Sequence, residues 1–471
     1  MEKKKIVKKK ADQTTPDPSC SGGERVHKKP WQETQATSKD IEEFLNKYVI
    51  LRHNTVTGQP EFRVPECDEF ESLGMQYITG ATPLDEWRSA TEWHNVCDRF
   101  VNSLINMLSR QKDVSERVMW RVINSDYVPL YNPFETYLSR LPPWDGTTNH
   151  IMDLASTVTV KGGAEELLLF YACLRKWLVA MIAGWLDDDV VNQEILVLVG
   201  RQGIYKTTWF NSLLPPALER YFHSNTSFGN MTKDEVLKLS MYGLICCEEL
   251  DTMKPSEMNR LKWAVTTTVT DERRAYAHYA ERRSHIASYC GTGNNIQFID
   301  DDTGTRRWLP FEVDSILSPR DHPSDHDAVF AQAYALYRQG FRYWFSERET
   351  QLMARHNERF EVAKEERDLI STYYRVPKPG EPSEFVSSSE ILMHVGGLLA
   401  QRLTSNKLGR AMTALGFDGM RSHGRRGYRV VAFTPEQVKA NKSMLACDAK
   451  PDSEASTVTM EEICDTFDTL F

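Results

Sequence analysis

The stretch VGRQGIYKTTWFN, which begins at Val199, ends a glycine-containing loop with a lysine and a threonine. Its spacing nearly fits the phosphate-binding pattern G-x-x-x-x-G-K-[ST], with Gly200 first and Lys206 and Thr207 last. In that pattern backbone N–H groups cradle phosphates, the lysine supplies a point charge, and the threonine hydroxyl coordinates Mg²⁺. We therefore predict a site for ATP and Mg²⁺ made by Gly200, Gly203, Ile204, Tyr205, Lys206, Thr207 and Thr208.

The loop departs from the pattern at one position, because Tyr205 stands where glycine is usual before the lysine. Gly203 can still provide the tight turn. Tyr205 then needs only a conformation open to an L-residue, with its ring pointing outward. The alternative is an ordinary strand, turn and helix with an incidental lysine.

Acidic side chains follow a second apolar strand, in the stretch GLICCEELD. A P-loop enzyme needs one acid for Mg²⁺ and one to orient the attacking water. Glu248 and Glu249 leave the strand first and Asp251 follows; we favour Glu249 as catalytic acid and metal ligand, with Glu248 the open alternative. Acids after a strand also serve as helix caps, which is the competing interpretation.

A third apolar strand ends in GTGNN, where a polar side chain could sense the terminal phosphate. Asn294 is the predicted sensor and Asn295 the alternate. Arg306 and Arg307 follow on a turn, and one of them could stabilise transition-state charge as a finger, at its own site or a neighbour's. Otherwise they are surface arginines paired with Asp300 to Asp302.

These residues need a scaffold that brings strand ends together, and the pattern supplies one. Short apolar strands alternate with helices from about residue 166 onward, which is typical of an α/β fold with a parallel sheet covered by helices on both faces. The sequence thus predicts a P-loop NTPase core, preceded by a mostly helical accessory region and followed by a small domain.

The set of motifs resembles the virulence-associated protein E family of P-loop proteins. The resemblance rests on NPFETYLSRLPPWDG, GRQGIYKTT, EELD, IASYCGTGN and DDTGTRRWLPF, and spans roughly residues 130 to 345. Members occur in phages, plasmids and genomic islands and are related to superfamily-three helicases and phage-type primase-helicases. The resemblance implies an ATPase with a core like that of hexameric replicative helicases. It assigns Lys206 and Thr207 to the phosphate and magnesium positions, Asn294 to the sensor, and Arg306 and Arg307 to the arginine pair.

In the related helicases a hairpin between the acid strand and the sensor strand reaches into a central pore. The same interval here reads TDERRAYAHYAERRSH, where arginines alternate with aromatic residues. Guanidinium groups for phosphates and rings for base stacking suit sequence-tolerant binding of single strands. We predict DNA contacts at Arg273, Arg274, Tyr276, Tyr279, Arg282 and Arg283; a solvated charged face is the alternative.

The C-terminal piece reads as two helices and a basic hairpin, which suggests a winged helix. Lys407 and Arg410 would lie on its recognition helix, and Arg425 and Arg426 on its wing. A structural lid or an oligomer contact is the alternative.

Composition bounds the class of protein. The 471 residues carry a formal net charge of −9, and the nine cysteines show no zinc spacing. The apolar stretch from Leu167 is interrupted by charges, so it favours a buried helix over a membrane span, and we expect a cytoplasmic protein. The expected divisions are a basic tail (1–40), an accessory domain (41–130), the ATPase domain (131–350), a helix and linker (351–382), the winged-helix-like domain (383–435) and an acidic tail (436–471).

The sequence therefore favours a DNA-stimulated ATPase that acts as a replicative helicase or origin-opening motor of a mobile element. Single-stranded or forked DNA, a homo-oligomeric ring such as a hexamer, and a separate primase are the expected partners, with no membrane. A nucleotide-dependent DNA-binding switch without unwinding activity, in regulation or phage interference, is the second hypothesis, and an inert scaffold the third.

Overall fold

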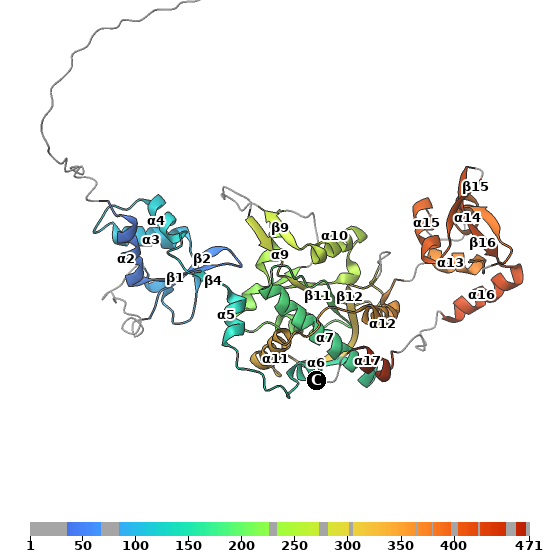
Figure 1. Cartoon of the computed structure of the whole chain (residues 1–471), viewed down its shortest axis with the longest axis horizontal. Coiled ribbons are helices and arrows are strands. Elements are labelled where there is room, and N and C mark those ends of the chain that lie inside the picture. Colours follow the sequence, from blue (N-terminus) through green and yellow to red (C-terminus); the bar gives the residue numbers. More distant parts are fainter. Residues whose placement is uncertain are drawn as a thin grey trace, which may run out of the picture. The chain divides into compact units, whose positions relative to one another are not determined.

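The structure is a computed structural model that describes residues 35–66, 84–225, 233–272, 281–300, 305–362, 365–378, 380–396, 404–422, 424–448 and 458–467. The chain divides into two compact units, Met1–Tyr131 and Asn132–Phe471. Each is described by itself (Figure 1).

The N-terminal unit packs helices against a small sheet with strand order β3-β2-β1-β4. Its elements are α2 (Ser38–Tyr48), β1 (Ile50–Asn54), β2 (Gln59–Arg63), η1 (Asp85–Trp87), β3 (His94–Asn95), α3 (Asp98–Leu108), α4 (Glu116–Ile123) and β4 (Leu130–Tyr131). Phe62 of β2 stacks on Phe100 of α3 in the core, and both are fully buried. The sequence predicted two of the four strands; β3 and β4 are two residues long and leave no periodicity to read.

The second unit contains a six-stranded sheet with strand order β5-β12-β6-β11-β8-β7. The strands are β5 (Val158–Val160), β6 (Ile195–Val199), β7 (Phe222–Asn225), β8 (Leu244–Cys247), β11 (Ser288–Gly293) and β12 (Trp308–Ile316). All adjacent pairs are parallel except β5 with β12. A separate antiparallel pair joins β9 (Val269–Glu272) to β10 (Glu281–Ser284).

Helices cover both faces of this sheet, so the predicted mixed α/β class is confirmed. The helices are α5 (Pro133–Arg140), α6 (His150–Ala155), α7 (Gly163–Leu186), α8 (Lys206–Asn211), α9 (Lys233–Met241), α10 (Pro255–Thr266), α11 (His326–Arg338) and α12 (Glu347–Asn357), with η2 (Glu219–Tyr221), η3 (Leu250–Thr252) and η4 (Glu358–Phe360) between them. Val197 of β6 lies in one core cluster with Leu261 of α10. On the other face Phe170 of α7 meets Phe311 of β12, with ring centroids 5.0 Å apart.

Helix α7 is the long apolar stretch noted in the sequence. Of the helices that the structure describes, it is the one long and apolar enough to cross a membrane, but 89% of its most apolar window is buried inside the protein. Its buried Lys176 is accommodated by ion pairing, because Nζ lies 3.1 Å from Glu349 Oε1 and donates to the carbonyl of Arg342 at 2.7 Å. These contacts are those of a core helix.

The segment after α12 forms a small sheet with helices. It comprises α13 (Glu365–Tyr373), β13 (Tyr374–Arg375), β14 (Glu384–Ser387), α14 (Ser388–Gly396), α15 (Ser405–Ala414), β15 (Gly419–Ser422), β16 (Arg425–Ala432) and α16 (Pro435–Asp448). Strand β16 pairs antiparallel with β13, β14 and β15. Ile391, Leu408, Tyr428 and Val430 form its core, each at most 1% exposed.

The segment expected to be an acidic tail contains α16 and a last helix, α17 (Met460–Thr466). Ile463 of this helix and Phe467, the residue that follows it, are both buried. Phe467 contacts Phe345, and Glu462 pairs with Arg355 of α12 at 3.1 Å. The difference from the expectation arises because the apolar residues among the acids dock this helix.

Candidate functional site at the carboxyl edge of the sheet

Three loops of the predicted site meet at one edge of the six-stranded sheet. Strands β6, β11 and β8 are neighbours and parallel, so the loops that follow Val199, Gly293 and Cys247 leave from the same edge. From β6 the chain proceeds to β7 at one end of the sheet, and from β11 to β12 on the opposite side of β6. Open α/β sheets bind ligands in the crevice at such a switch point.

The backbone of the loop predicted to bind phosphate, called the P-loop below, explains why glycine is usual before the lysine. Gly203 has φ +82°, and Tyr205 itself adopts the left-handed conformation, with φ 68° and ψ 18°. An L-residue can adopt this conformation at a cost of about 1–2 kcal/mol. The Tyr205 side chain is 47% exposed, while the neighbouring Ile204 is buried.

Lys206 is held at the mouth of this loop by three hydrogen bonds. Its Nζ donates to the carbonyl oxygens of Gly200 at 2.6 Å and Arg201 at 2.8 Å, and to Asn294 Oδ1 at 3.3 Å. Burial lowers the pKa of the Lys206 ammonium, and the Asp251 carboxylate partly offsets this. The structure thus brings the predicted lysine and the predicted sensor, Asn294, into direct contact.

Asp251 links the loop after β8 to the loop after β11. Its Oδ1 accepts from the backbone N–H of Asn294 at 3.1 Å, and its Oδ2 from that of Asn295 at 3.2 Å. Sequence reasoning noted Asp251 only as the third acid after the strand. Its link to Asn294 could not be read from the sequence, because the strand order that places β8 beside β11 is a tertiary property.

The two glutamates that follow β8 have different surroundings. The Glu248 carboxylate accepts from the Ser224 hydroxyl, which lies on β7, on the side of β8 away from β11. Glu249 is exposed, has φ 53° and ψ 47°, and precedes η3. Glu248 is thus engaged with the neighbouring strand, whereas Glu249 is exposed to solvent at this edge.

Tyr205 and Glu249 are the two residues other than glycine with positive φ in the part of the chain that the structure describes. Both lie on loops at this one edge. Backbone strain of this kind concentrates at functional sites, where the surrounding structure holds it in place. Together with the Lys206 contacts, it distinguishes this edge from the rest of the sheet.

Arg306 and Arg307 lie at the opposite edge. The Arg307 carbonyl accepts from the backbone N–H of Ile195 at 2.7 Å, and Trp308 pairs with Ile195 in the parallel register of β12 with β6. Ile195 begins β6, whereas the P-loop follows its end, so the two are separated by roughly 16 Å at about 3.3 Å per residue. The structure does not bring these arginines to their own chain's P-loop.

Asn357, which sequence reasoning missed, holds the turn that bears the arginines. It is fully buried at the end of α12, and its Nδ2 donates to the carbonyls of Thr305 at 3.2 Å and Trp308 at 2.9 Å. These two residues bracket Arg306 and Arg307. No local signal marks Asn357, because its partners are about fifty residues away in the chain.

The predicted DNA contacts fall in two other places. Arg273, Arg274, Tyr276 and Tyr279 lie outside the described residues, whereas Arg282 and Arg283 belong to β10. Lys407 and Arg410 are exposed on α15, and Arg425 and Arg426 are exposed at the start of β16.

The donor atoms at the P-loop edge suit a magnesium ion that is shared with phosphates. The Thr207 hydroxyl and the Glu249 carboxylate, the two predicted ligands, are oxygen donors, which Mg²⁺ prefers, and Mg²⁺ usually keeps several waters and phosphate oxygens among its ligands. Within the described ranges no cluster of three or more His, Cys, Asp or Glu residues forms a dedicated metal cage.

Comparison with known proteins gives a family and several solved structures. Residues 138–362 match the model of the virulence-associated protein E-like domain. The chain is similar to an apo structure of the NrS-1 C-terminal region, at 11% identity and a TM-score of 0.39, covering 83% of this chain and 98% of that one. Two A-form apo structures of that region cover the same shares, at 12% identity with TM-score 0.39 and at 11% with TM-score 0.40. No curated protein matches the chain.

Proposed function

Since residues 138–362 match the model of the virulence-associated protein E-like domain, we propose that the protein is a DNA-stimulated ATPase that acts as a replicative helicase or origin-opening motor of a mobile element. The observation that carries this proposal is the position of Lys206. Its ammonium lies among the P-loop carbonyls, in contact with Asn294 and under the influence of Asp251. A cation between two loops at a sheet switch point suits a nucleotide triphosphate.

In this proposal the residues at the edge divide the tasks of phosphoryl transfer. Lys206 and the P-loop N–H groups bind the β- and γ-phosphates, and Thr207 and Glu249 would hold Mg²⁺, which would supply positive charge beside the phosphates. Glu249 also orients the attacking water. Asn294 contacts the γ-phosphate, and Asp251 fixes the backbone of Asn294 and therefore the direction of its amide.

The arginine pair supports action between subunits. Arg306 and Arg307 precede β12, at the sheet edge opposite the P-loop, so neither side chain spans the distance to its own Lys206. An arginine finger supplied by a neighbour can accelerate phosphoryl transfer by about 10³-fold or more. We therefore propose that the protein forms a homo-oligomeric ring. The proposal further includes a cytoplasmic setting, with single-stranded or forked DNA and a separate primase as partners.

The proposal is tested by measuring ATP hydrolysis of the full chain with and without single-stranded DNA. Hydrolysis should rise severalfold with DNA, and Lys206→Ala should abolish it without unfolding the protein. Lys238→Ala is the matched control, because Lys238 lies on α9 and pairs with Glu235 rather than with the P-loop. Wild-type hydrolysis by the Lys206→Ala protein would refute the site.

One observation favours a second function. Tyr205 retains a strained conformation where glycine would be relaxed, which suits a loop that binds nucleotide tightly and turns it over slowly. In that case the protein is a nucleotide-dependent DNA-binding switch. Tight ATP binding with no DNA-stimulated turnover, in the same experiment, would select this function.

A further inference from the structure

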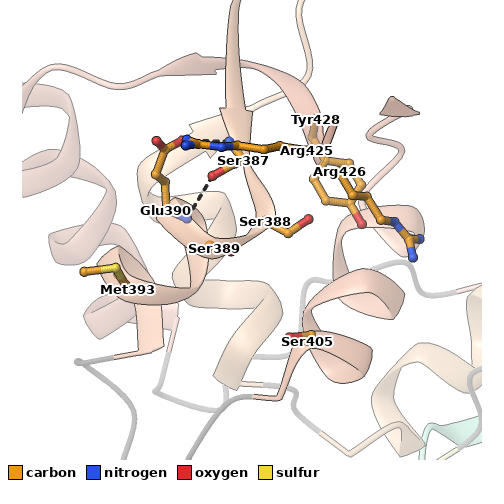
Figure 2. Close-up of a pocket in the computed structure, with 9 residues that line it drawn as sticks. All are labelled: Ser387, Ser388, Ser389, Glu390, Met393, Ser405, Arg425, Arg426 and Tyr428. Atoms are coloured by element: carbon orange, nitrogen blue, oxygen red, sulfur yellow. Dashed lines mark hydrogen bonds between the residues drawn. The ribbon is translucent and has the colours of Figure 1, made fainter. Parts of the chain in front are cut away.

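The C-terminal segment contains a cavity of about 440 Å³ that the predicted site does not include. Its lining is mostly polar, includes one aromatic ring, and comes from β14, α14, α15 and β16 (Figure 2). The lining residues are Ser387, Ser388, Ser389, Glu390, Met393, Ser405, Arg425, Arg426 and Tyr428. The cavity thus lies where the first turn of α14, the first turn of α15 and the start of β16 converge.

The polar groups that face this cavity are mostly donors. Arg425 and Arg426 are exposed and bring two guanidinium groups, and no described hydrogen bond engages the side chains of Ser388, Ser389 or Ser405. The one acid, Glu390, is already used, because its carboxylate accepts from the backbone N–H of Ser387 at 2.8 Å as a helix cap. Hydrogen bonding to Ser387 lowers the pKa of Glu390, so it stays charged and committed to the cap.

Tyr428 provides an independent indication of a ligand. It is 1% exposed, lines the cavity, and uses its phenolic oxygen in no hydrogen bond among the residues that the structure describes. Figure 2 shows its ring beneath Arg426, with the hydroxyl directed toward the space beside Ser388. The side chain is thus nearly buried while its hydroxyl has no partner among the described residues, so the hydroxyl is available to an acceptor that enters the cavity.

The charge around the cavity is opposite to that of the whole chain. Residues 384–432 contain seven arginines and lysines against three acids, whereas the chain has a formal net charge of −9. An electropositive cavity with hydroxyl donors, guanidinium groups and the first N–H groups of a helix suits a phosphate. Phosphate contacts position a protein on nucleic acid without reading its sequence.

We propose that this cavity binds one phosphodiester of DNA, with Arg425, Arg426 and the hydroxyls of Ser388, Ser389, Ser405 and Tyr428 as its ligands. The proposal rests on the DNA-binding part of the proposed function and extends it from exposed basic residues to a defined phosphate site.

The test is DNA affinity of the full chain as a function of salt, measured by fluorescence anisotropy with a labelled duplex and a labelled single strand. Arg426→Ala should weaken binding about tenfold and reduce the salt slope by about one. Tyr428→Phe should weaken binding severalfold with the slope unchanged, because it removes a hydrogen bond and no charge. Ser389→Ala, at an exposed position, should weaken binding in the same way without risk to the core.

Arg429→Ala is the matched control, because Arg429 is exposed on β16 and does not line the cavity. It should change affinity less than twofold. Wild-type affinity in both Tyr428→Phe and Ser389→Ala, or equal losses in Arg426→Ala and Arg429→Ala, would overturn the proposal.

Inorganic phosphate separates DNA from a free anion as the source of the phosphate. Calorimetric titration with phosphate, followed by DNA, should show that DNA displaces it. Phosphate binding that DNA leaves unchanged would overturn the DNA assignment. Because these readouts measure binding, a protein without ATPase activity would refute the proposed motor and leave the cavity untouched.

Discussion

At Tyr205 the free-energy cost of the left-handed backbone conformation can be measured separately from the contribution of the ring. Its φ of 68° costs any residue with a Cβ atom about 1–2 kcal/mol of folding free energy. Glycine avoids this cost, but it loses more conformational entropy on folding, which offsets roughly 0.5–1 kcal/mol of the gain. We expect Tyr205→Gly to stabilise the protein by about 0.5–1 kcal/mol in urea unfolding.

Tyr205→Ala is the control, since alanine keeps the Cβ atom and removes only the half-exposed ring. It should bring no gain, and equal stabilisation by both variants would assign the strain to the ring. ATP affinity of Tyr205→Gly should stay within about tenfold of wild type, or about 1.4 kcal/mol. A gain of several hundredfold would mean that tyrosine impairs the loop.

For single residues, the sequence indicated which residue types could form the site but not which contacts each side chain makes. The P-loop spacing drew attention to Lys206, and the strand endings to Glu249 and Asn294. The different environments of Glu248 and Glu249 depend on a left-handed turn at Glu249 and on a hydrogen bond from Ser224 of β7 to Glu248. Neither the turn nor the strand pairing leaves a local pattern.

Among the elements, the turn before β12 depends on a side chain from α12. Asn357 donates to the carbonyls on both sides of Arg306 and Arg307, so Asn357→Ala should let the turn move. We expect ATP hydrolysis to fall by at least tenfold while ATP affinity is retained, because the P-loop is at the opposite edge.

Gln332→Ala is a matched control for the loss of a buried amide. Gln332 lies buried on α11, and its amide contacts Asn149 and Ile151 rather than the arginine turn. Both variants should lose about 1–3 kcal/mol of stability in unfolding experiments. An equal loss of hydrolysis in the two would show that Asn357 acts through stability rather than through the position of the turn.

The elements themselves were predictable where hydrophobic runs were long. Alternating apolar strands and helices indicated the mixed α/β class, and the charges inside α7 indicated a buried helix. The strand order was not accessible, because β6 pairs with β11 and β12, which follow it by about ninety residues or more. Helix α17 was missed because Ile463 and Phe467 stand among acids and become apolar contacts only against Phe345 and its surroundings.

For the whole molecule, the opposite locations of Lys206 and the arginine pair predict complementation. A Lys206→Ala chain keeps Arg306 and Arg307, and an Arg306→Ala/Arg307→Ala chain keeps the P-loop. Mixing the two inactive proteins under conditions of subunit exchange should restore part of the ATP hydrolysis, because some interfaces then combine an intact loop with intact arginines.

Light scattering on the mixture provides the control for assembly. If mixed oligomers form and the mixture hydrolyses no more ATP than its components, arginine action in trans is refuted. A finger within one chain would then require a rearrangement of the turn held by Asn357.

If the proposed assembly forms, the separation of Lys206 from the arginines by the length of a sheet strand makes the ATPase activity depend on the concentration of the protein. In the proposed assembly an isolated chain possesses two incomplete halves of a catalytic centre, so the rate per chain rises with protein concentration until rings are filled. A mobile element that encodes such a chain would start its motor only after enough copies had accumulated, with no repressor needed to set the threshold.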